Sequence, residues 1–260
     1  DVDSRDYRIR RLLAAIWLYR YTEEDRFQDS LINWNAYTAP NSWDYREMEP
    51  IFNFATCPDL PNLDTNLRQL YRDMTLNHAQ SWMLNTAGTR NLRQAWDFMG
   101  PTNNGLQSTP QTLPAIVAYH LTGNTAYRDL VYTSADFNLG ANPLNMTWVT
   151  GMGERRPDRG VLDLSSWYYE FPGKPEAEVY PGIVPYAHHT PNNDNTGSAN
   201  GPHNNDWAIQ RLYPPVAQWP VHETWQYNRQ SPRTGEFTIN QNLAKAAAVY
   251  GFLCAPADGA

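Results

Sequence analysis

The sequence is poor in cysteine and in long apolar runs, and both shortages narrow the classes of protein that it can encode. Only Cys57 and Cys254 occur in 260 residues, too few for a disulfide framework and without the spacing of metal ligands. They could pair with each other or remain free thiols. No stretch approaches the roughly 18 consecutive apolar residues of a membrane-spanning helix, so we expect no membrane partner. We expect no signal peptide within these residues.

Basic charge is also scarce. The chain has 20 Lys and Arg against 27 Asp and Glu, a net charge of -7, whereas a protein that binds duplex nucleic acid presents a basic face. We therefore expect no nucleic-acid partner. Aromatic residues are abundant instead, with 10 Trp, 16 Tyr and 8 Phe. Their flat faces suit stacking on sugar rings, but large cores also contain aromatics, so composition leaves both interpretations open.

Helical periodicity dominates the chain, and strand-like alternation is scarce. Apolar residues recur at helical spacing in segments 8–22, 62–84, 112–123, 125–139 and 237–253, and more weakly in 24–34 and 90–99. Thr112 is a candidate cap for the third helix, Pro114 lies in its first turn and Gly123 ends it. The pattern predicts an all-α protein.

Two segments resemble each other at an offset of 100 residues. The first set of matching positions is Ala15, Ile16, Tyr19, Thr22, Phe27 and Asp29, and the second is Ala115, Ile116, Tyr119, Thr122, Tyr127 and Asp129. Each segment reads as a helix, a short polar turn and the start of another helix, which suggests stacked helical hairpins. We predict a single domain over residues 1–260, with hairpins in 1–140, loops in 141–235 and a last helix at 236–253.

The predicted loop region is rich in proline, glycine and aromatic residues. Long loops within a compact domain are usually functional or disordered, and the aromatic content argues against disorder. Loops of this kind on one face of a helical scaffold are a natural place for a substrate groove. The candidate substrate-binding aromatics are Trp167, Tyr186, Trp207, Tyr213, Trp219 and Trp225.

Several motifs, in the same order along the chain, resemble those of glycoside hydrolase family 9, the cellulase type. Residues 139–144 and 148–153 read Leu-Gly-Ala-Asn-Pro-Leu and Trp-Val-Thr-Gly-Met-Gly, similar to that family's Gly-x-Asn-Pro turn and Val-Thr-Gly-x-Gly loop. Residues 122–124, Thr-Gly-Asn, followed by Tyr127, resemble its Thr-Gly-Asp/Asn turn. Residues 235–242, Gly-Glu-Phe-Thr-Ile-Asn-Gln-Asn, resemble the motif in which a Glu precedes an apolar run and an Asn.

The resemblance implies an (α/α)6 toroid that cleaves β-1,4-linked glucan with inversion, requires no cofactor and uses Glu236 as its general acid. Some relatives bind Ca²⁺, which could serve here as a structural ion. A general acid needs an apolar or anionic setting that raises its pKa, and Glu236 adjoins Phe237. A helix N-terminus favours the ionised form, however, so Glu236 could instead be a first-turn residue that complements the helix dipole.

The chain departs from the family pattern in its catalytic base, its length and a sugar-binding motif. An inverting enzyme needs a second carboxylate about 6.5–9.5 Å from the acid, and the Asp-x-Gly-Asp-Tyr motif that supplies it is absent. The family barrel also exceeds this length, so we expect about half of it here, as a fragment or beside an N-terminal half on another chain. The family's His-His-Arg trio is missing after Pro157. Arg159 or Asp163 could contact sugar in its place, or could form a loop salt bridge.

Other polar residues in the loops allow further interpretations. A metal site could be formed by His188, His189, His203, Asp194 and Asp206, but their spacing matches no ligand motif and favours solvated loop residues. Residues 192–195 could offer oxygens to Ca²⁺ but lack the spacing of a calcium loop. Glu223 is a second candidate acid, and Asp206 could line the groove.

Two alternatives to hydrolysis remain open from the sequence. The missing base and the missing His-His-Arg trio fit a non-catalytic glycan-binding remnant on the same scaffold. Polysaccharide lyases also use helical toroids, so a lyase is the second alternative.

We expect the protein to be secreted, either extracellular or periplasmic.

Overall fold

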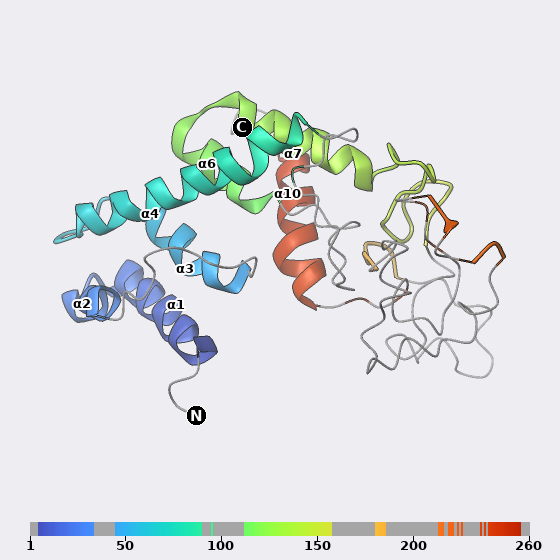
Figure 1. Ribbon diagram of the computed structural model, residues 1–260. Coiled ribbons are helices and arrows are strands. Elements are labelled where there is room, and N and C mark those ends of the chain that lie inside the picture. Colours follow the sequence, from blue (N-terminus) through green and yellow to red (C-terminus); the bar gives the residue numbers. More distant parts are fainter. Residues whose placement is uncertain are drawn as a thin grey trace, which may run out of the picture. The chain divides into compact units, whose positions relative to one another are not determined.

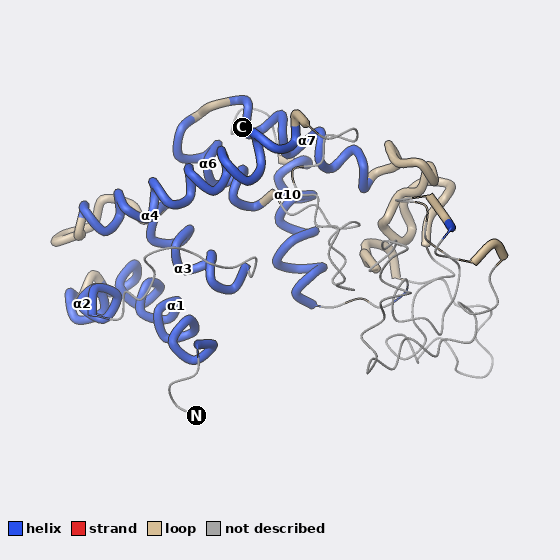
Figure 2. Tube along the Cα trace, viewed as in Figure 1, coloured by secondary structure: helices blue, strands red, loops and turns tan. Residues whose placement is uncertain are grey.

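The computed structural model describes residues 5–33, 45–89, 95, 112–157, 180–185, 213–215, 218–220, 223, 225, 235, 237 and 239–255. Figure 1 shows their helices, which are α1 (Arg5–Thr22), α2 (Asp25–Asn33), α3 (Tyr45–Ala55), α4 (Thr65–His78), η1 (Ala79–Leu84), α5 (Asn85–Ala87), α6 (Leu113–Thr122), α7 (Thr125–Asn138), η8 (Asn240–Ala247) and α10 (Ala248–Cys254). In Figure 2 these described parts are helices joined by loops and turns, without a strand. One isolated antiparallel bridge joins Leu139 and Thr147.

The chain divides into two compact units. One comprises Asp1–Asn85 and Pro114–Arg128, and the other comprises Thr86–Leu113 and Asp129–Ala260. The predicted single domain over residues 1–260 stays a prediction. No helix among the described residues is long and apolar enough to cross a membrane.

The first unit is built around α1, which packs against α2 and α3, while α3 packs against α4. The buried stripe of α1 includes Ile9, Leu12, Ile16 and Tyr19, a spacing that places all four on one face of the helix. Burial of each such side chain contributes about 1.5–3 kcal/mol to folding. The sequence placed this helix at 8–22, and the structure confirms it with an earlier start.

Helix α3 is the element that the sequence analysis missed. It carries Pro50 in its interior, a residue that removes one backbone hydrogen bond and usually ends or kinks a helix. Burial compensates, because Ile51 and Phe54 are 1% and 0% exposed. The Phe54 ring also meets Tyr71 of α4 edge to face, with centroids 5.7 Å apart. Tertiary packing here outweighs a local signal against the helix.

The predicted 100-residue repeat is a repeat of turn geometry. After α1, the Glu23 N–H donates to the Tyr19 carbonyl, and the Thr22 hydroxyl donates to the Leu18 carbonyl. After α6, Gly123 and Thr122 make the same bonds to the carbonyls of Tyr119 and Ala118. In both turns the residue after the threonine is left-handed, with φ of 58° at Glu23 and 68° at Gly123. Each hairpin therefore reverses direction through one αL residue, as helix C-termini commonly do.

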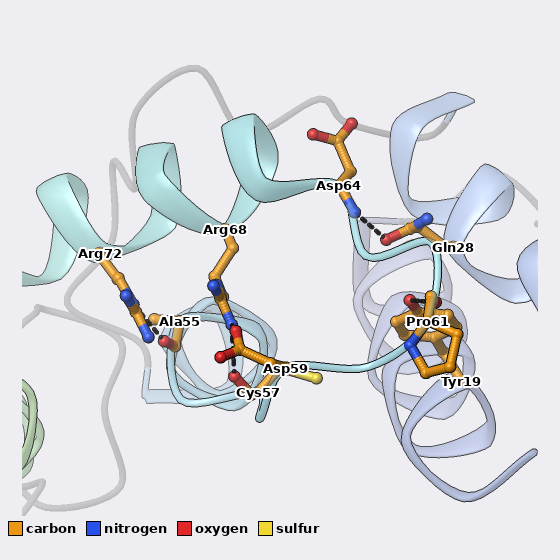
Figure 3. A network of polar contacts seen from close by, with 9 residues as sticks. All are labelled: Tyr19, Gln28, Ala55, Cys57, Asp59, Pro61, Asp64, Arg68 and Arg72. Atoms are coloured by element: carbon orange, nitrogen blue, oxygen red, sulfur yellow. Dashed lines mark hydrogen bonds and ion pairs between the residues drawn. The ribbon is translucent and has the colours of Figure 1, made fainter. Parts of the chain in front are cut away.

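The linker between α3 and α4 is held by side chains from α1, α2 and α4 (Figure 3). Gln28 is 5% exposed; its amide nitrogen donates to the Asn62 carbonyl at 2.8 Å, and its oxygen accepts from the Asp64 N–H at 2.6 Å. The Tyr19 hydroxyl donates to the Pro61 carbonyl at 2.9 Å. Asp64 in turn caps α4 by accepting from the Leu67 N–H. A few buried polar groups thus fix where α4 begins.

Arginines of α4 satisfy the open carbonyls at the end of α3. Arg72 donates to the Ala55 carbonyl at 2.9 Å, and Arg68 donates to the Cys57 carbonyl at 3.2 Å while contacting Asp59 at 2.6 Å. Figure 3 shows both side chains directed from α4 to this segment. Cation donors suit the negative end of a helix dipole. Burial raises the pKa of the Cys57 thiol, and both Cys57 and the exposed Cys254 are free.

The remaining predicted helices are confirmed with shifted bounds. Segment 65–87 is helical through α4, η1 and α5, and α6 and α7 begin and end close to the predicted positions. The last helix is π-wound from Asn240 to Ala247 before it becomes α-helical. It buries Ala246 and Val249, whereas Ile239 is 76% exposed. The weak segment 90–99 lies almost wholly outside the described residues, with only the buried Ala95 described.

Candidate functional site

A single side chain organises the turn that follows α7. The Asn142 amide nitrogen donates to the carbonyls of Phe137 and Met146, both at 2.7 Å. Its amide oxygen accepts from the N–H groups of Leu144 and Met146, both at 3.2 Å. All four hydrogen-bonding positions of the amide are thereby used. The asparagine of the Gly-x-Asn-Pro motif therefore replaces the backbone pairing that the ending helix gives up.

The loop after this turn folds back on the end of α7. The Trp148 N–H donates to the Asn138 carbonyl at 2.8 Å, and the Thr147 N–H donates to the Arg155 carbonyl at 2.9 Å. Gly153 has φ of 75°, and a Cβ there would lie 2.8 Å from the Thr147 hydroxyl oxygen. Both this close contact and the positive φ favour glycine. They explain why the last position of the Val-Thr-Gly-x-Gly motif is a glycine.

Thr150 joins this loop to the distant segment 180–185. Its N–H donates to the Ile183 carbonyl and its carbonyl accepts from the Gly182 N–H, both at 2.9 Å. Its hydroxyl accepts from the Ile183 N–H at 2.9 Å and donates to the Tyr180 carbonyl at 2.5 Å. One threonine thus makes four hydrogen bonds to a segment about thirty residues away, which fixes that segment's register.

Segment 180–185 is held from its other side by the last helix. The Val184 N–H donates to Oδ1 of Asn242 at 2.7 Å, and Nδ2 of Asn242 donates to the Val184 carbonyl at 3.2 Å. Val184 itself is buried with Val149 and Ala246. A polar clamp and a small apolar core therefore coincide, so that the loop after α7, segment 180–185 and η8 form one packed assembly.

A second cluster lies beneath the α7 turn. Met146, Trp148 and Trp225 are buried together, with Leu144 against them. The rings of Trp148 and Trp225 meet edge to face, with centroids 5.6 Å apart and an interplanar angle of 67°. Edge-to-face pairs of this kind add to the energy of burial.

The predicted site residues fall into two groups. Tyr213 is 93% exposed, Trp219 is partly buried and donates from Nε1 to the Pro214 carbonyl at 2.7 Å, and Trp225 is 8% exposed within the core. The others lie outside the described residues: Arg159, Asp163, Trp167, Tyr186, Asp206, Trp207 and Glu236. Roles in catalysis and in substrate binding stay predictions for every member of the set.

Within this assembly the pKa of one described titratable side chain, Tyr250, is shifted by its surroundings. Burial raises the pKa of Tyr250, whose ring packs against the cluster of Val149, Val184 and Ala246. Its phenol is therefore uncharged at physiological pH. No group of His, Cys, Asp and Glu side chains suited to a metal ion occurs in the described part of the chain, and the structural Ca²⁺ stays a prediction.

Sequence reasoning missed the parts of Thr150, Tyr180 and Asn242 in this assembly. Thr150 lies in the Val-Thr-Gly-x-Gly motif and Asn242 lies six residues after Glu236, but the motifs themselves indicated a role for Glu236 alone. The partners of these two residues are 33 and 58 residues away. Hydrophobic periodicity reports only on near neighbours, so it does not predict such pairs. A threonine or asparagine placed between apolar residues of a recognised motif was the available signal.

Comparisons with known proteins agree on one family. The sequence model of glycosyl hydrolase family 9 matches residues 3–249. A metagenome-derived family 9 endoglucanase superposes with a TM-score of 0.68 and 20% identity, covering 95% of this chain and 40% of its own. A mutant thermostable endoglucanase from Alicyclobacillus acidocaldarius gives a TM-score of 0.69 and 18% identity, covering 95% and 43%.

A third similar structure is AaCel9A in complex with cellobiose-like isofagomine, with a TM-score of 0.66, 17% identity and coverage of 94% and 42%. The chain thus spans about two-fifths of the length of the solved structures it matches. A search of the curated proteins finds no match. The all-α fold is part of an (α/α)6 toroid, and the resemblance in the motifs is confirmed: the chain belongs to glycosyl hydrolase family 9.

Proposed function

We propose that the protein hydrolyses β-1,4-linked glucan, a cellulose-like polysaccharide, with inversion at the anomeric carbon. The observation that carries the proposal is the family match over residues 3–249. The similar structures support it, since two are described as endoglucanases and a third holds a cellobiose-like ligand. Because the chain spans only part of those proteins, the activity is assigned to the assembled toroid.

Glu236 is the proposed general acid. It would protonate the glycosidic oxygen of the leaving sugar while a second carboxylate activates water on the opposite face of the ring, with the two groups about 6.5–9.5 Å apart. The Asp-x-Gly-Asp-Tyr motif expected to carry that base is absent from residues 1–260. We therefore propose that the base belongs to another part of the toroid, on the same or a second polypeptide.

The described framework supports such a site through its rigidity. Asn242 follows Glu236 by six residues, and its amide ties η8 to Val184, which Thr150 connects to the loop after α7 through Ile183. Catalytic groups need a backbone that holds them close to the productive geometry. The loop after α7, segment 180–185 and η8 therefore share one hydrogen-bonded support.

Hydrolysis of a soluble β-glucan tests the proposal. The complete natural polypeptide that contains residues 1–260 should release reducing ends, and Glu236→Gln should lower kcat by about 10²–10⁴-fold, the usual contribution of a general acid. Glu23→Gln, an exposed change in the first unit, is the matched control and should leave kcat unchanged. Proton NMR of the first product should show the inverted anomer.

Three results would count against parts of the proposal. Near wild-type hydrolysis by Glu236→Gln removes the role of Glu236, and a retained anomer removes inversion. Tight glycan binding without product would identify the non-catalytic glycan-binding protein instead.

We also propose that the protein works outside the cell or in the periplasm, where polysaccharide substrates are found.

A further inference from the structure

Helix α1 carries apolar side chains on two opposite faces. One face holds Leu12, Ile16 and Tyr19, all of them buried. The other holds Leu18 and Tyr21, which are 44% and 81% exposed. Because an α-helix turns by about 100° per residue, the two sets lie on opposite sides of the helix. A helix at the surface of a finished protein usually turns polar groups to solvent, so the second apolar face calls for an explanation.

The exposed face is continuous over two turns of α1. Ala14, Leu18 and Tyr21 follow one another at the spacing that aligns side chains along a helix. Trp17 lies beside them, and its ring stacks on Tyr21 at a centroid distance of 6.0 Å and an interplanar angle of 25°. The Arg20 guanidinium lies 5.1 Å from the centre of the Trp17 ring. Ala14, Trp17, Leu18 and Tyr21 thus form one surface, the α1 outer face, in which each ring is held by a neighbour.

Helix α2 of the same unit shows a different exposed side. Asp25, Arg26 and Asp29 are exposed and charged, while Leu31 is buried. Ile32, near the end of the helix, is an exposed apolar residue of the scattered kind that protein surfaces usually carry. A contiguous apolar patch, by contrast, marks an interaction site. The α1 outer face belongs to this second kind.

The comparisons with solved structures indicate what covers the α1 outer face. The three matched structures superpose on 94–95% of this chain, but the match covers only 40%, 43% and 42% of their own length. More than half of each therefore has no counterpart in residues 1–260. In a ring of helical hairpins, neighbours on both sides bury the apolar faces of each hairpin. Within the first unit α1 packs against α2 and α3, and the outer face stays exposed.

We propose that the α1 outer face is the docking surface for a helix from the part of the toroid that lies outside residues 1–260. This inference rests on the proposed assembly of a complete toroid and assigns that assembly a surface. The partner helix must present an apolar stripe, because Leu18 and the rings of Trp17 and Tyr21 gain from burial only against apolar groups. Ala14 leaves room for close approach, since the distance between packed helices depends on the side chains at their contact.

Photo-crosslinking tests this surface in the complete natural polypeptide that contains residues 1–260, assembled with its second chain where two chains make the toroid. Leu18 is replaced by p-benzoylphenylalanine, and the crosslinked peptides are identified by mass spectrometry after irradiation. We expect crosslinks to residues outside 1–260. Asp29, on the charged side of α2, is the matched control position and should give far fewer of them.

Hydrogen exchange of the α1 amides is a second measurement that needs no crosslinker. In the complete polypeptide, Leu18→Ala should speed this exchange by at least about tenfold, because truncation of a leucine packed against a partner destabilises its surroundings. Truncation of a side chain that faces only solvent has little effect. Asp29→Ala should therefore exchange as wild type.

Crosslinks from Leu18 into the second unit of this chain alone would place that unit on the α1 outer face, and crosslinks between two α1 helices would make it a homodimer surface. Either result, or a lack of crosslinks with wild-type exchange in Leu18→Ala, overturns the proposal. Neither measurement uses hydrolysis. A protein that gives the expected crosslinks but releases no reducing ends refutes the proposed activity and leaves the docking surface standing, whereas one that hydrolyses glucan without those crosslinks refutes the docking surface alone.

Discussion

The side-chain amide of Asn242 pairs with the backbone of Val184 as a second peptide group would, with the Val184 N–H donating to Oδ1 at 2.7 Å and Nδ2 donating to the Val184 carbonyl at 3.2 Å. The two residues are 58 positions apart. Because Val184 is 0% exposed, water cannot easily replace the amide if it is lost. The pair therefore ties η8 to segment 180–185 through two hydrogen bonds.

Removal of this amide should destabilise the second unit. Asn242→Ala leaves the N–H and carbonyl of Val184 without their partner, and we expect a loss of about 2–4 kcal/mol from two unsatisfied buried groups. Hydrogen exchange of the Val184 amide, together with urea unfolding, measures it. Asn66→Ala, an exposed change on α4, is the control; equal protection of Val184 in both variants would refute the expectation.

Gly151 should not tolerate a side chain. Its φ is 72°, and a Cβ would lie 2.6 Å from the Pro181 Cβ and 3.0 Å from its Cα, so Gly151→Ala must displace segment 180–184. We expect a loss of about 1–3 kcal/mol, typical of overpacking. Gly88→Ala, where no atom lies within 4 Å of the added Cβ, is the control. Thermal unfolding of the two variants at equal midpoints would contradict the steric argument.

Replacement of Glu23 by glycine should stabilise the protein against unfolding. It adopts φ of 58°, whereas the matching turn after α6 has Gly123 at 68°. A left-handed conformation costs a non-glycine residue about 1–2 kcal/mol, and the greater freedom of glycine in the unfolded chain offsets about half of that. We expect Glu23→Gly to raise the free energy of unfolding by about 0.5–1 kcal/mol.

Glu23→Ala separates the backbone effect from the loss of charge. It removes the carboxylate but keeps the Cβ, so the left-handed strain remains and no gain should be seen in urea unfolding. The proposed cause is wrong if Glu23→Ala and Glu23→Gly stabilise the protein equally.

His78 should make the first unit sensitive to acid. Burial lowers the pKa of His78 from its ordinary value of 6.5, and its ring stacks on Trp82 at a centroid distance of 6.5 Å. Below pH 6.5 the unfolded chain takes up this proton more readily than the folded one, so stability falls as pH falls. Well above pH 6.5 both states are neutral at this position and the effect vanishes.

Urea unfolding at about pH 7.5 and about pH 5.5 measures this dependence. His78→Gln should lose less stability than wild type over the interval, and His120→Gln, at an exposed position on α6, should follow wild type. Curves for His78→Gln and wild type that run parallel would show that His78 does not contribute.

The parts of the fold that could be predicted are those that depend on near neighbours in the chain. Thr112, Pro114 and Gly123 marked α6 because caps and stops act within a few residues. The 100-residue repeat predicted matching hairpins, and the turns at Glu23 and Gly123 do share their hydrogen bonds. Helix α3 was not predicted because Pro50 is a local signal against a helix. Packing against α1 and α4 outweighs that signal.

The candidate site was predictable only in part for the same reason. The motifs around Asn142 and Thr150 were visible, and Asn142 bonds within five residues of itself. The partners of Thr150 and Asn242 lie on remote segments, so their function as clamps had no sequence signature. The exposure of the Tyr180 side chain could not be predicted either, because the sequence of a loop does not indicate whether an aromatic ring is buried or exposed.

The sequence by itself determined the helical class, the approximate positions of most helices and the family, because helix signals act among close neighbours and the family motifs are short local stretches. Only the tertiary structure decided which apolar faces are covered. Trp17 is exposed while Trp225 is buried, and the last helix covers Ala246 and Val249 rather than Ile239 and Leu243. Part of that helix is π-wound, which rotates its side chains relative to the α-helical period. Burial depends on which distant segments meet, and that is settled by packing over the whole chain.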